Sequence, residues 1–352
     1  MSYNRIGTPR AYIDKINFDL TNGYRSVSNI AMLQDDGSSA VTFASGQKED
    51  IFDLRPANYA TIEEENQAFY IQYDSGISTD AYPESNYLAI LGHNFNTADV
   101  VFKVELDDAS DMASPTIVTT TGNHTKVVNA EADADANYID PARNGWTLIT
   151  WSTQTSDNRY VRITFSDDAG TGINFDDDVK IGAIMWGEYI DFPNAPDLSV
   201  QTTIDYDGTK LQDSAGGGTF ANSIYTGQPM WAATPPWLPY GSDVPTYTFQ
   251  RRDGRLHHKM NFSYMADTDL FAQDMGTAAA SYWYDSDSLH STFFQKILGQ
   301  HNPFLFTIDK DATDANYSNG SYGLFRLADS GFNATQVAHQ TWSIGLNLRE
   351  TW

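Results

Sequence analysis

The side chains best able to do chemistry in this chain of 352 residues are its carboxylates, which comprise 37 Asp and 9 Glu. Two paired carboxylates could act as the acid and base of a glycoside hydrolase. With 46 acidic side chains, however, some pair falls at a suitable distance in almost any fold, and no pair stands out here. We therefore predict no catalytic residue, no cofactor and a protein that is not an enzyme.

Two acidic runs are candidate calcium sites. The run 309–314 resembles the start of an EF-hand loop, but its sixth position is Asp314, where that loop needs Gly. Its twelfth position is Gly320, where the loop needs Glu. We predict no metal site, and a calcium site of another type at 309–314 or at Asp176-Asp177-Asp178 stays open as an alternative.

Motifs for nucleophiles, phosphates and other metals are missing from the sequence. The chain has no Cys, which excludes thiolate chemistry, and it has no nucleophile elbow, P-loop or dinucleotide fingerprint. His257 and His258 are neighbours in a predicted strand, so their side chains point to opposite faces and do not share a metal. The motifs therefore favour a structural or binding function.

The charge of the chain excludes two classes of partner. With 21 basic and 46 acidic side chains, the net charge is −25 and the pI is near 4.3. Such a polyanion is not expected to bind nucleic acid or an anionic membrane. No apolar run reaches the roughly 18–20 residues that span a bilayer, so we expect a soluble, unprocessed chain. One basic cluster interrupts the acidity, and its members are the candidate subunit-interface residues Arg251, Arg252, Arg255 and Lys259.

The elements that must position these groups are mostly strands. Asp favours turns whereas Glu favours helices, so the excess of Asp places the charge in loops. Short alternating apolar runs between Asp- and Gly-rich turns predict a mainly β fold. We expect a β-sandwich (jelly roll) at 61–195 and a second β-rich assembly domain at 196–352 with one or two helices. Residues 1–60 are expected to be an extended segment packed on the second domain, with extended patches at 11–13 and 16–18.

Two local predictions concern the second domain. Asp253-Gly254 fits a two-residue turn between strands at 246–252 and 255–264, in a register that pairs Phe249 with His258. A helix is expected at 287–298, because Leu289, Phe293 and Ile297 form an apolar stripe and Gly299 suits the position after the helix. Asp285 or Ser286 could cap its start.

Several segments resemble structural proteins of tailed bacteriophages. The resemblance is carried by Arg5-Ile6-Gly7-Thr8-Pro9-Arg10-Ala11-Tyr12-Ile13-Asp14, Asn86-Tyr87-Leu88-Ala89-Ile90-Leu91-Gly92-His93-Asn94, Val179-Lys180-Ile181-Gly182-Ala183-Ile184-Met185-Trp186-Gly187-Glu188, Gly216-Gly217-Gly218-Thr219-Phe220-Ala221-Asn222-Ser223 and Trp342-Ser343-Ile344-Gly345-Leu346-Asn347-Leu348-Arg349-Glu350. The third segment is similar to the closing strand of a galactose-binding-like jelly roll. The last is similar in rhythm to the final strand of tail-tube and distal-tail proteins.

This resemblance implies a non-enzymatic component of a phage tail, of the distal tail, tail-hub or minor tail type. It further implies a homo-oligomeric ring formed through the C-terminal domain, with other virion tail proteins as partners. Such a protein is assembled in the cytoplasm of the host bacterium and is located in the virion tail. Ring symmetry and copy number are left open.

Two other functions remain as alternatives. A carbohydrate- or receptor-binding virion protein, such as a tail fibre or a capsid decoration, would bind a host glycan through exposed aromatic side chains. The 8 Trp and 20 Tyr could line such a surface, or they could be large core and interface residues. A polysaccharide depolymerase would need a cleft with coupled carboxylates of shifted pKa.

Overall fold

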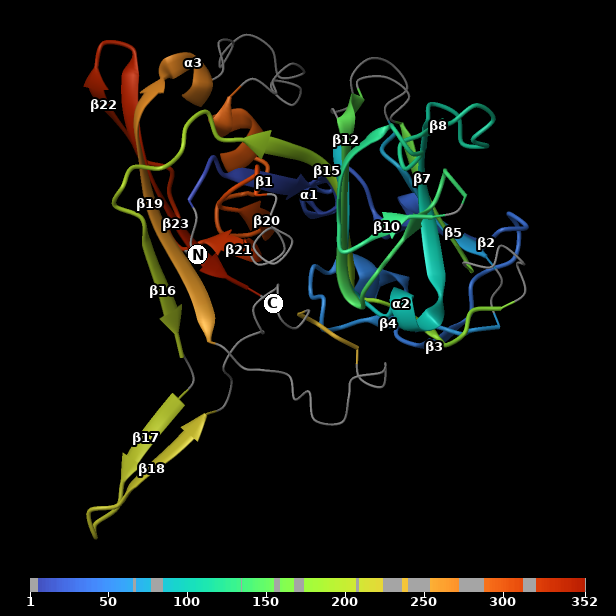
Figure 1. Ribbon diagram of the computed structural model, residues 1–352, viewed down its shortest axis with the longest axis horizontal. Helices are drawn as coiled ribbons and strands as arrows, with labels where there is room; N and C mark the ends of the chain where they lie inside the picture. Colours follow the sequence, from blue (N-terminus) through green and yellow to red (C-terminus); the bar gives the residue numbers. More distant parts are fainter. Residues whose placement is uncertain are drawn as a thin grey trace.

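The computed structural model describes residues 6–65, 68–76, 85–133, 135–154, 159–167, 174–206, 209–223, 236–239, 254–271, 288–312 and 321–351. Strands dominate it, in sheets of 11, 7, 3 and 2 strands (Figure 1). The predicted fold class, mainly β with a β-sandwich (jelly roll) and a second β-rich part, is confirmed. None of the helices among these residues is long and apolar enough to cross a membrane.

The largest sheet runs through the whole molecule. In spatial order its strands are β16 (Gln201–Asp205), β19 (Arg255–Ala266), β23 (Thr341–Glu350), β21 (Tyr322–Leu327), β20 (Phe304–Thr307), β1 (Arg10–Asp14), β15 (Ala183–Asp191), β6 (Ser85–His93), β12 (Gly145–Gln154) and β9 (His124–Val128), and β22 (Ala334–Ala338) pairs with β23. Strand β1 pairs with β15 on one side and with β20 on the other. The N-terminal strand therefore joins the sandwich to the C-terminal part.

A second sheet lies against half of the first and completes the sandwich (Figure 1). Its strands are β10 (Glu131–Ala132), β11 (Ile139–Asp140), β7 (Val100–Asp107), β13 (Tyr160–Asp167), β5 (Phe69–Asp74) and β2 (Ile30–Gln34), with β8 (Thr116–Ile117) on β7. A small third sheet consists of β14 (Val179–Ile181), β4 (Ala60–Ile62) and β3 (Phe43–Ser45). The fourth is the hairpin of β17 (Thr209–Asp213) and β18 (Thr219–Ser223).

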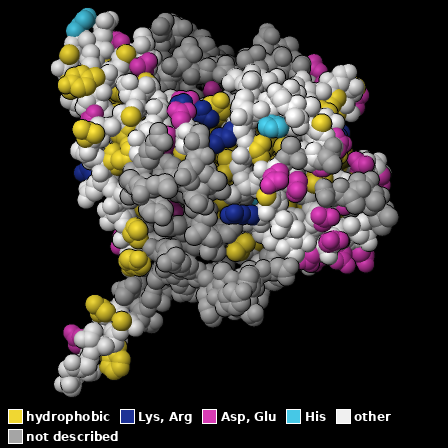
Figure 2. Space-filling model, viewed as in Figure 1, with side chains coloured by type: hydrophobic (Ala, Val, Ile, Leu, Met, Phe, Trp, Pro, Cys, Tyr) yellow, Lys and Arg dark blue, Asp and Glu magenta, His cyan; other side chains and the backbone are white. Residues whose placement is uncertain are grey.

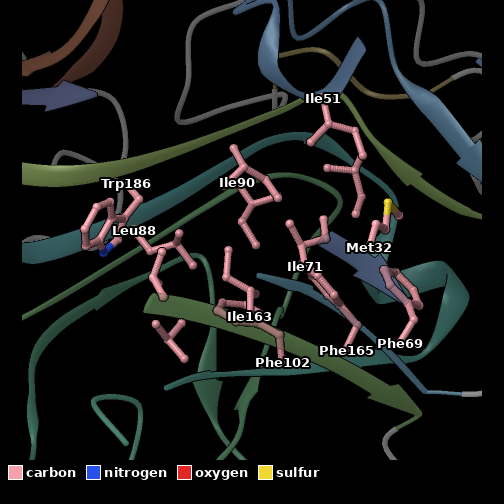
Figure 3. Close-up of a cluster of buried hydrophobic side chains, with 14 of the residues drawn as sticks. Met32, Ile51, Phe69, Ile71, Leu88, Ile90, Phe102, Ile163, Phe165 and Trp186 are labelled. Carbon is pink, nitrogen blue, oxygen red and sulfur yellow. The ribbon is translucent and has the colours of Figure 1, made fainter. Parts of the chain in front are cut away.

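The core of the sandwich comes from alternate residues of facing strands. Phe102 on β7 and Ile163 on β13 face Leu88 and Ile90 on β6, and Trp186 on β15 closes one end (Figure 3). The neighbours of these residues along each strand point the other way, as the period of two requires. Strand β6 is buried on both faces, because Tyr87, Ala89 and Leu91 join another apolar cluster behind it. That accounts for its uninterrupted apolar sequence.

One extended patch predicted near the N-terminus is wrong. Residues 16–18 lie in helix α1 (Lys15–Asn22), because Asp14 caps its first turn and Gly23 ends it with φ of +72°. The other helical segments are α2 (Phe95–Ala98), α3 (Asp267–Leu270), η1 (Val27–Asn29), η2 (Lys48–Phe52) and the π-helical η3 (His290–Phe294). Residues 30–62 supply β2, β3 and β4. The division of the chain at residues 60 and 195 stays a prediction.

The helix predicted at 287–298 is shorter than expected and has a different winding. Its regular part is η3, followed by turns, although Leu289, Phe293 and Ile297 are buried as the stripe predicts. Gly299 adopts φ of +66°, which suits its predicted place after the helix. The two candidate caps at 285 and 286 lie outside the described residues.

The predicted hairpin around Asp253-Gly254 has the correct second strand but the wrong neighbour for it. His258 on β19 pairs with Thr202 of β16 on one side and with Leu348 of β23 on the other, so no edge is left there for Phe249. Residues 240–253 lie outside the described residues. The predicted face is correct, because His258 and Met260 are both buried. The alternation of a strand sets which face is apolar but not which strand lies beside it.

Candidate functional site

The acidic runs do not gather into a metal site within the described ranges, where no group of three His, Asp or Glu side chains is placed to hold an ion. Asp309 accepts the backbone N–H of Asp311 at 3.1 Å, and Asp311 binds the side chain of Lys310 at 2.8 Å. Asp178 accepts the backbone N–H of Glu64 at 3.0 Å. Asp309 and Asp311 therefore stabilise their own loop, and Asp178 joins its loop to the segment at Glu64.

Asp14 is the carboxyl whose environment most resembles that of a catalytic acid. Its side chain is buried, and burial raises its pKa to about 6. Its Oδ1 accepts the backbone N–H of Ile16 and of Trp186, both at 3.2 Å. Its Oδ2 accepts the backbone and side-chain N–H of Asn17, at 3.2 and 2.6 Å. Enclosed by these donors, Asp14 caps α1 and ties it to β15.

His93 is also fully buried, at the end of β6. Its Nδ1 accepts the backbone N–H of Phe95 at 3.3 Å, so the neutral ring carries its proton on Nε2 and donates it to Oγ1 of Thr147 at 3.0 Å. Burial lowers the pKa of His93 to about 3. Its ring also stacks on Phe95 with centroids 4.3 Å apart. These contacts make His93 a structural residue of the sandwich.

Two of the four residues of the basic cluster belong to the described structure. Arg255 begins β19 opposite Asp205 and is half-buried, whereas Lys259 is exposed on the same strand. Arg251 and Arg252 lie outside the described residues. Their role as subunit-interface residues stays a prediction.

Exposed apolar side chains gather on one flank of the C-terminal part. Of the exposed large hydrophobic residues described, seven belong to β16, the hairpin, β19, β22 and their connections: Leu198, Ile204, Tyr206, Leu211, Phe220, Tyr264 and Val337. Figure 2 shows hydrophobic side chains on the same flank and on the hairpin below it. Strand β16 is exposed along its whole length and has one hydrogen-bonded neighbour, β19, within the described structure. A strand edge without a partner in the described structure, beside apolar side chains, is typical of a protein-binding surface.

The hairpin of β17 and β18, which we call the arm, extends away from the rest of the molecule (Figure 1). Its strands pair only with each other in the described structure. Leu211 is 70% exposed and Phe220 is 67% exposed. In the register of the arm, Leu211 faces Ala221 while Phe220 faces Gln212, so the two large side chains lie on opposite faces. A partner would have to contact both faces of the arm to bury them.

Charge is unevenly divided between the two parts of the chain. Residues 1–195 hold 30 acidic and 12 basic side chains, a net charge of −18, whereas residues 196–352 hold 16 and 9, a net charge of −7. In Figure 2 the acidic side chains gather mainly over the sandwich, on the side opposite the arm. The apolar flank therefore lies on the less charged part of the molecule.

Three of the segments that resemble phage structural proteins lie side by side in the fold. Segment 5–14 contains β1, segment 86–94 contains most of β6, and segment 179–188 contains β14 and most of β15. Strands β1, β15 and β6 are neighbours in the largest sheet. Gly92 has φ of +71°, and an added Cβ would lie 2.1 Å from the carbonyl oxygen of Pro56. Asn94 bonds the backbone of Asp178 at 2.8 Å and of Lys180 at 2.7 Å. The Gly-His-Asn motif is thus a structural corner between β6 and β14.

The comparisons with known proteins find likenesses in structure only. No protein family matches the sequence, and no curated protein matches it. A chitosan-binding module of a chitosanase/glucanase from Paenibacillus sp. IK-5 is similar at 12% identity with a TM-score of 0.30, over 45% of this chain and 93% of the module. The module CBM32-1 of a family 31 glycoside hydrolase from Clostridium perfringens is similar at 12% identity with a TM-score of 0.30, over 46% of this chain and 94% of the module.

A third solved structure belongs to the same group. The CBM32 module of AlyQ, in complex with 4,5-unsaturated mannuronic acid, is 18% identical with a TM-score of 0.25, over 42% of this chain and 92% of the module. All three are carbohydrate-binding modules by name, and each matches less than half of this chain.

Proposed function

We propose that this chain is a non-enzymatic structural subunit that assembles with copies of itself through its C-terminal part. The observation that supports this proposal is the arm, whose Leu211 and Phe220 are exposed on opposite faces. A two-stranded hairpin alone in water is at best marginally stable. Contact with another subunit would bury both side chains and stabilise the arm, and the edge of β16 that has no partner among the described residues could add main-chain hydrogen bonds.

The finer proposal is a distal tail, tail-hub or minor tail protein that forms a ring in a bacteriophage tail. The sequence resemblance supports it, and a self-assembling part of this kind needs subunit contacts and no active site. The partners would be other copies of this chain and neighbouring tail proteins. The location would be the virion tail, after assembly in the bacterial cytoplasm.

If the arm forms the subunit contact, substitutions in it should weaken self-association. Replacing Leu211 and Phe220 together by serine is expected to weaken self-association at least about tenfold, because burying either side chain contributes roughly 1.5–3 kcal/mol. Sedimentation velocity over a concentration series measures the change. Tyr24→Ser, which removes an exposed aromatic side chain outside the arm and the flank, is the matched control and should assemble like the wild type. A wild-type protein that stays monomeric at all concentrations and is absent from particles contradicts the proposal.

The effect of salt on self-association shows whether the arm or the basic cluster forms the main contact between subunits. Copies that carry a charge of −25 repel one another, so added NaCl should strengthen an association based on apolar contacts. If Arg251, Arg252, Arg255 and Lys259 instead dock on an acidic neighbour, the same salt should weaken it. We expect strengthening between low salt and about 0.5 M NaCl, because the Debye length falls from roughly 30 Å at 0.01 M to roughly 8 Å at 0.15 M and becomes shorter still above that.

Glycan binding by the sandwich is the second candidate function. It comes to this chain from the names of the structurally similar modules, which bind carbohydrate. The tryptophans described in the sandwich, Trp146, Trp151 and Trp186, are all fully buried, so they offer no stacking surface. A glycan array probed with the full chain tests the candidate: a reproducible signal for one glycan class supports it, and no signal on a host-derived array removes it.

A further inference from the structure

Strand β22 leaves an edge of the largest sheet without the usual protection. It pairs with β23 on one side and has no second neighbour among the described strands, and its last four residues are exposed. Edge strands of proteins that stay monomeric are normally protected by charged side chains or proline. The chain has neither between Asp329 and Arg349, although 19% of its residues are charged. This edge is therefore suited to pairing with another strand.

Strand β18 of the arm has the properties of a partner for that edge. Like β22 it is five residues long and holds no charged side chain, and β17 is its one neighbour in the described structure. Strand β17, by contrast, carries Lys210 and Asp213. Phe220 on β18 is 67% exposed and Val337 on β22 is 52% exposed, and an aromatic side chain beside a β-branched one is a favourable cross-strand pair. The uncharged edge of the arm is thus the edge of β18.

The positions of the two strands require them to come from different copies. The arm extends from one end of the flank and β22 lies at the opposite end (Figure 1). The pairing agrees, because β16, which leads into the arm, pairs with residues 255–259 of β19. Strand β22 instead lies beside residues 341–344 of β23, which pair with the far end of β19. A contact between the arm and β22 is therefore head-to-tail, and such contacts close into rings or continue as filaments.

Charge disfavours the other edge of this flank as the place where copies pair. Strand β16 ends at Asp205, with Asp197 before it and Asp207 after it in the sequence. Pairing two such edges would bring like charges together between molecules that each carry a net charge of −25. Pairing β18 with β22 places no charged side chain of one strand opposite one of the other.

We propose that β18 of one copy adds as a further strand to the edge of β22 in the next copy, so that the largest sheet continues across the contact. Main-chain hydrogen bonds join the two strands, and Phe220 and Val337 are the large exposed side chains that the contact buries. This inference rests on the proposed assembly function, and it names the surface that receives the arm.

Pairs of single cysteines test this contact directly, because the chain has no Cys of its own. Ala221→Cys on β18 is mixed in turn with Thr335→Cys, Gln336→Cys and Val337→Cys on β22. Three positions are needed because the register of β22 against β23 shifts once, which leaves the register of a further strand open. Under mild oxidation we expect at least one mixture to form a cross-linked dimer, since paired strands bring Cα atoms within roughly 7 Å, the reach of a disulfide. Each variant alone should give only the background yield, because a head-to-tail contact does not bring identical positions together.

The matched control is Ala31→Cys, an exposed alanine on β2, which is an edge strand of the sandwich. Mixed with Ala221→Cys, it should also give only the background yield. Cross-linking of a β22 variant with itself would instead indicate a twofold contact between two β22 strands. A higher yield of Ala221→Cys with Thr203→Cys would place the arm on β16. Either result overturns the proposal.

A charge placed on β22 gives a second measurement, by sedimentation velocity. Val337→Asp is expected to weaken self-association at least about tenfold, because it buries an unpaired carboxylate between two acidic molecules. Ala31→Asp should assemble like the wild type. A wild type that self-associates and is weakened by L211S/F220S, but not by Val337→Asp, keeps the assembly function and overturns this inference. A wild type that stays monomeric at all concentrations overturns both.

Discussion

Replacing His93 with glutamine is expected to make the protein markedly less sensitive to acid. The usual pKa of histidine is about 6.5, and burial lowers that of His93 to about 3. The unfolded chain therefore takes up a proton below about pH 6.5, while the folded protein does not until about pH 3. The stability that the neutral ring contributes is present above pH 6.5 and is lost as the pH falls through this window.

The expected size of this effect follows from the same pKa difference. Between pH 6.5 and pH 4 the wild type should lose roughly 3 kcal/mol more of its free energy of unfolding than His93→Gln. Glutamine could keep the donor to Thr147 but loses the acceptor for the N–H of Phe95, so the variant is less stable than the wild type at neutral pH. The measured quantity is therefore the slope with pH, from urea denaturation at a series of pH values.

A control separates burial of the His93 ring from its hydrogen bond. Thr147→Val removes the hydroxyl partner of Nε2 but leaves the ring buried, and it should keep the acid sensitivity of the wild type. Identical slopes for the wild type and His93→Gln would show that His93 does not control the acid response.

Replacing Asp14 with asparagine is expected to have the opposite effect on the pH dependence. Burial raises the pKa of Asp14 to about 6, above its value of 3.8 in the absence of the fold. The folded protein therefore takes up this proton before the unfolded chain does. Protonation of Asp14 stabilises the fold below pH 3.8, and this contribution is lost as the pH rises through about 6.

The wild type should thus gain roughly 2 kcal/mol relative to Asp14→Asn between pH 6 and pH 4. The variant, which cannot gain this proton, should be the more acid-sensitive protein. Urea denaturation over the same pH series measures the difference. Asn17→Ala removes a donor that favours the ionised carboxylate, so it should enlarge the gain on acidification. A slope for Asp14→Asn that shifts in the same direction as that for His93→Gln would contradict the assignment.

The strands themselves could be predicted from the sequence because their pattern is local. Apolar residues alternate in the sequence at 69–73 and 100–106, and the structure has β5 and β7 there with the alternating side chains in the core. Helix α1 could not be distinguished from a strand in this way, because its apolar residues span too few turns to show a helical period and its cap depends on a single Asp14.

The neighbours of each strand, and every site built between them, were decided by the tertiary structure. Strand β1 lies between β15 and β20, and β19 between β16 and β23, and all four pairings join segments far apart in the chain. A cavity of about 350 Å³ likewise combines Phe18 of α1 with Phe294 of η3. Alternation and composition, which the sequence shows by itself, determined the β class, the apolar faces and the acidic surface. Pairing depends on which distant edges meet during folding, and no local pattern records that choice.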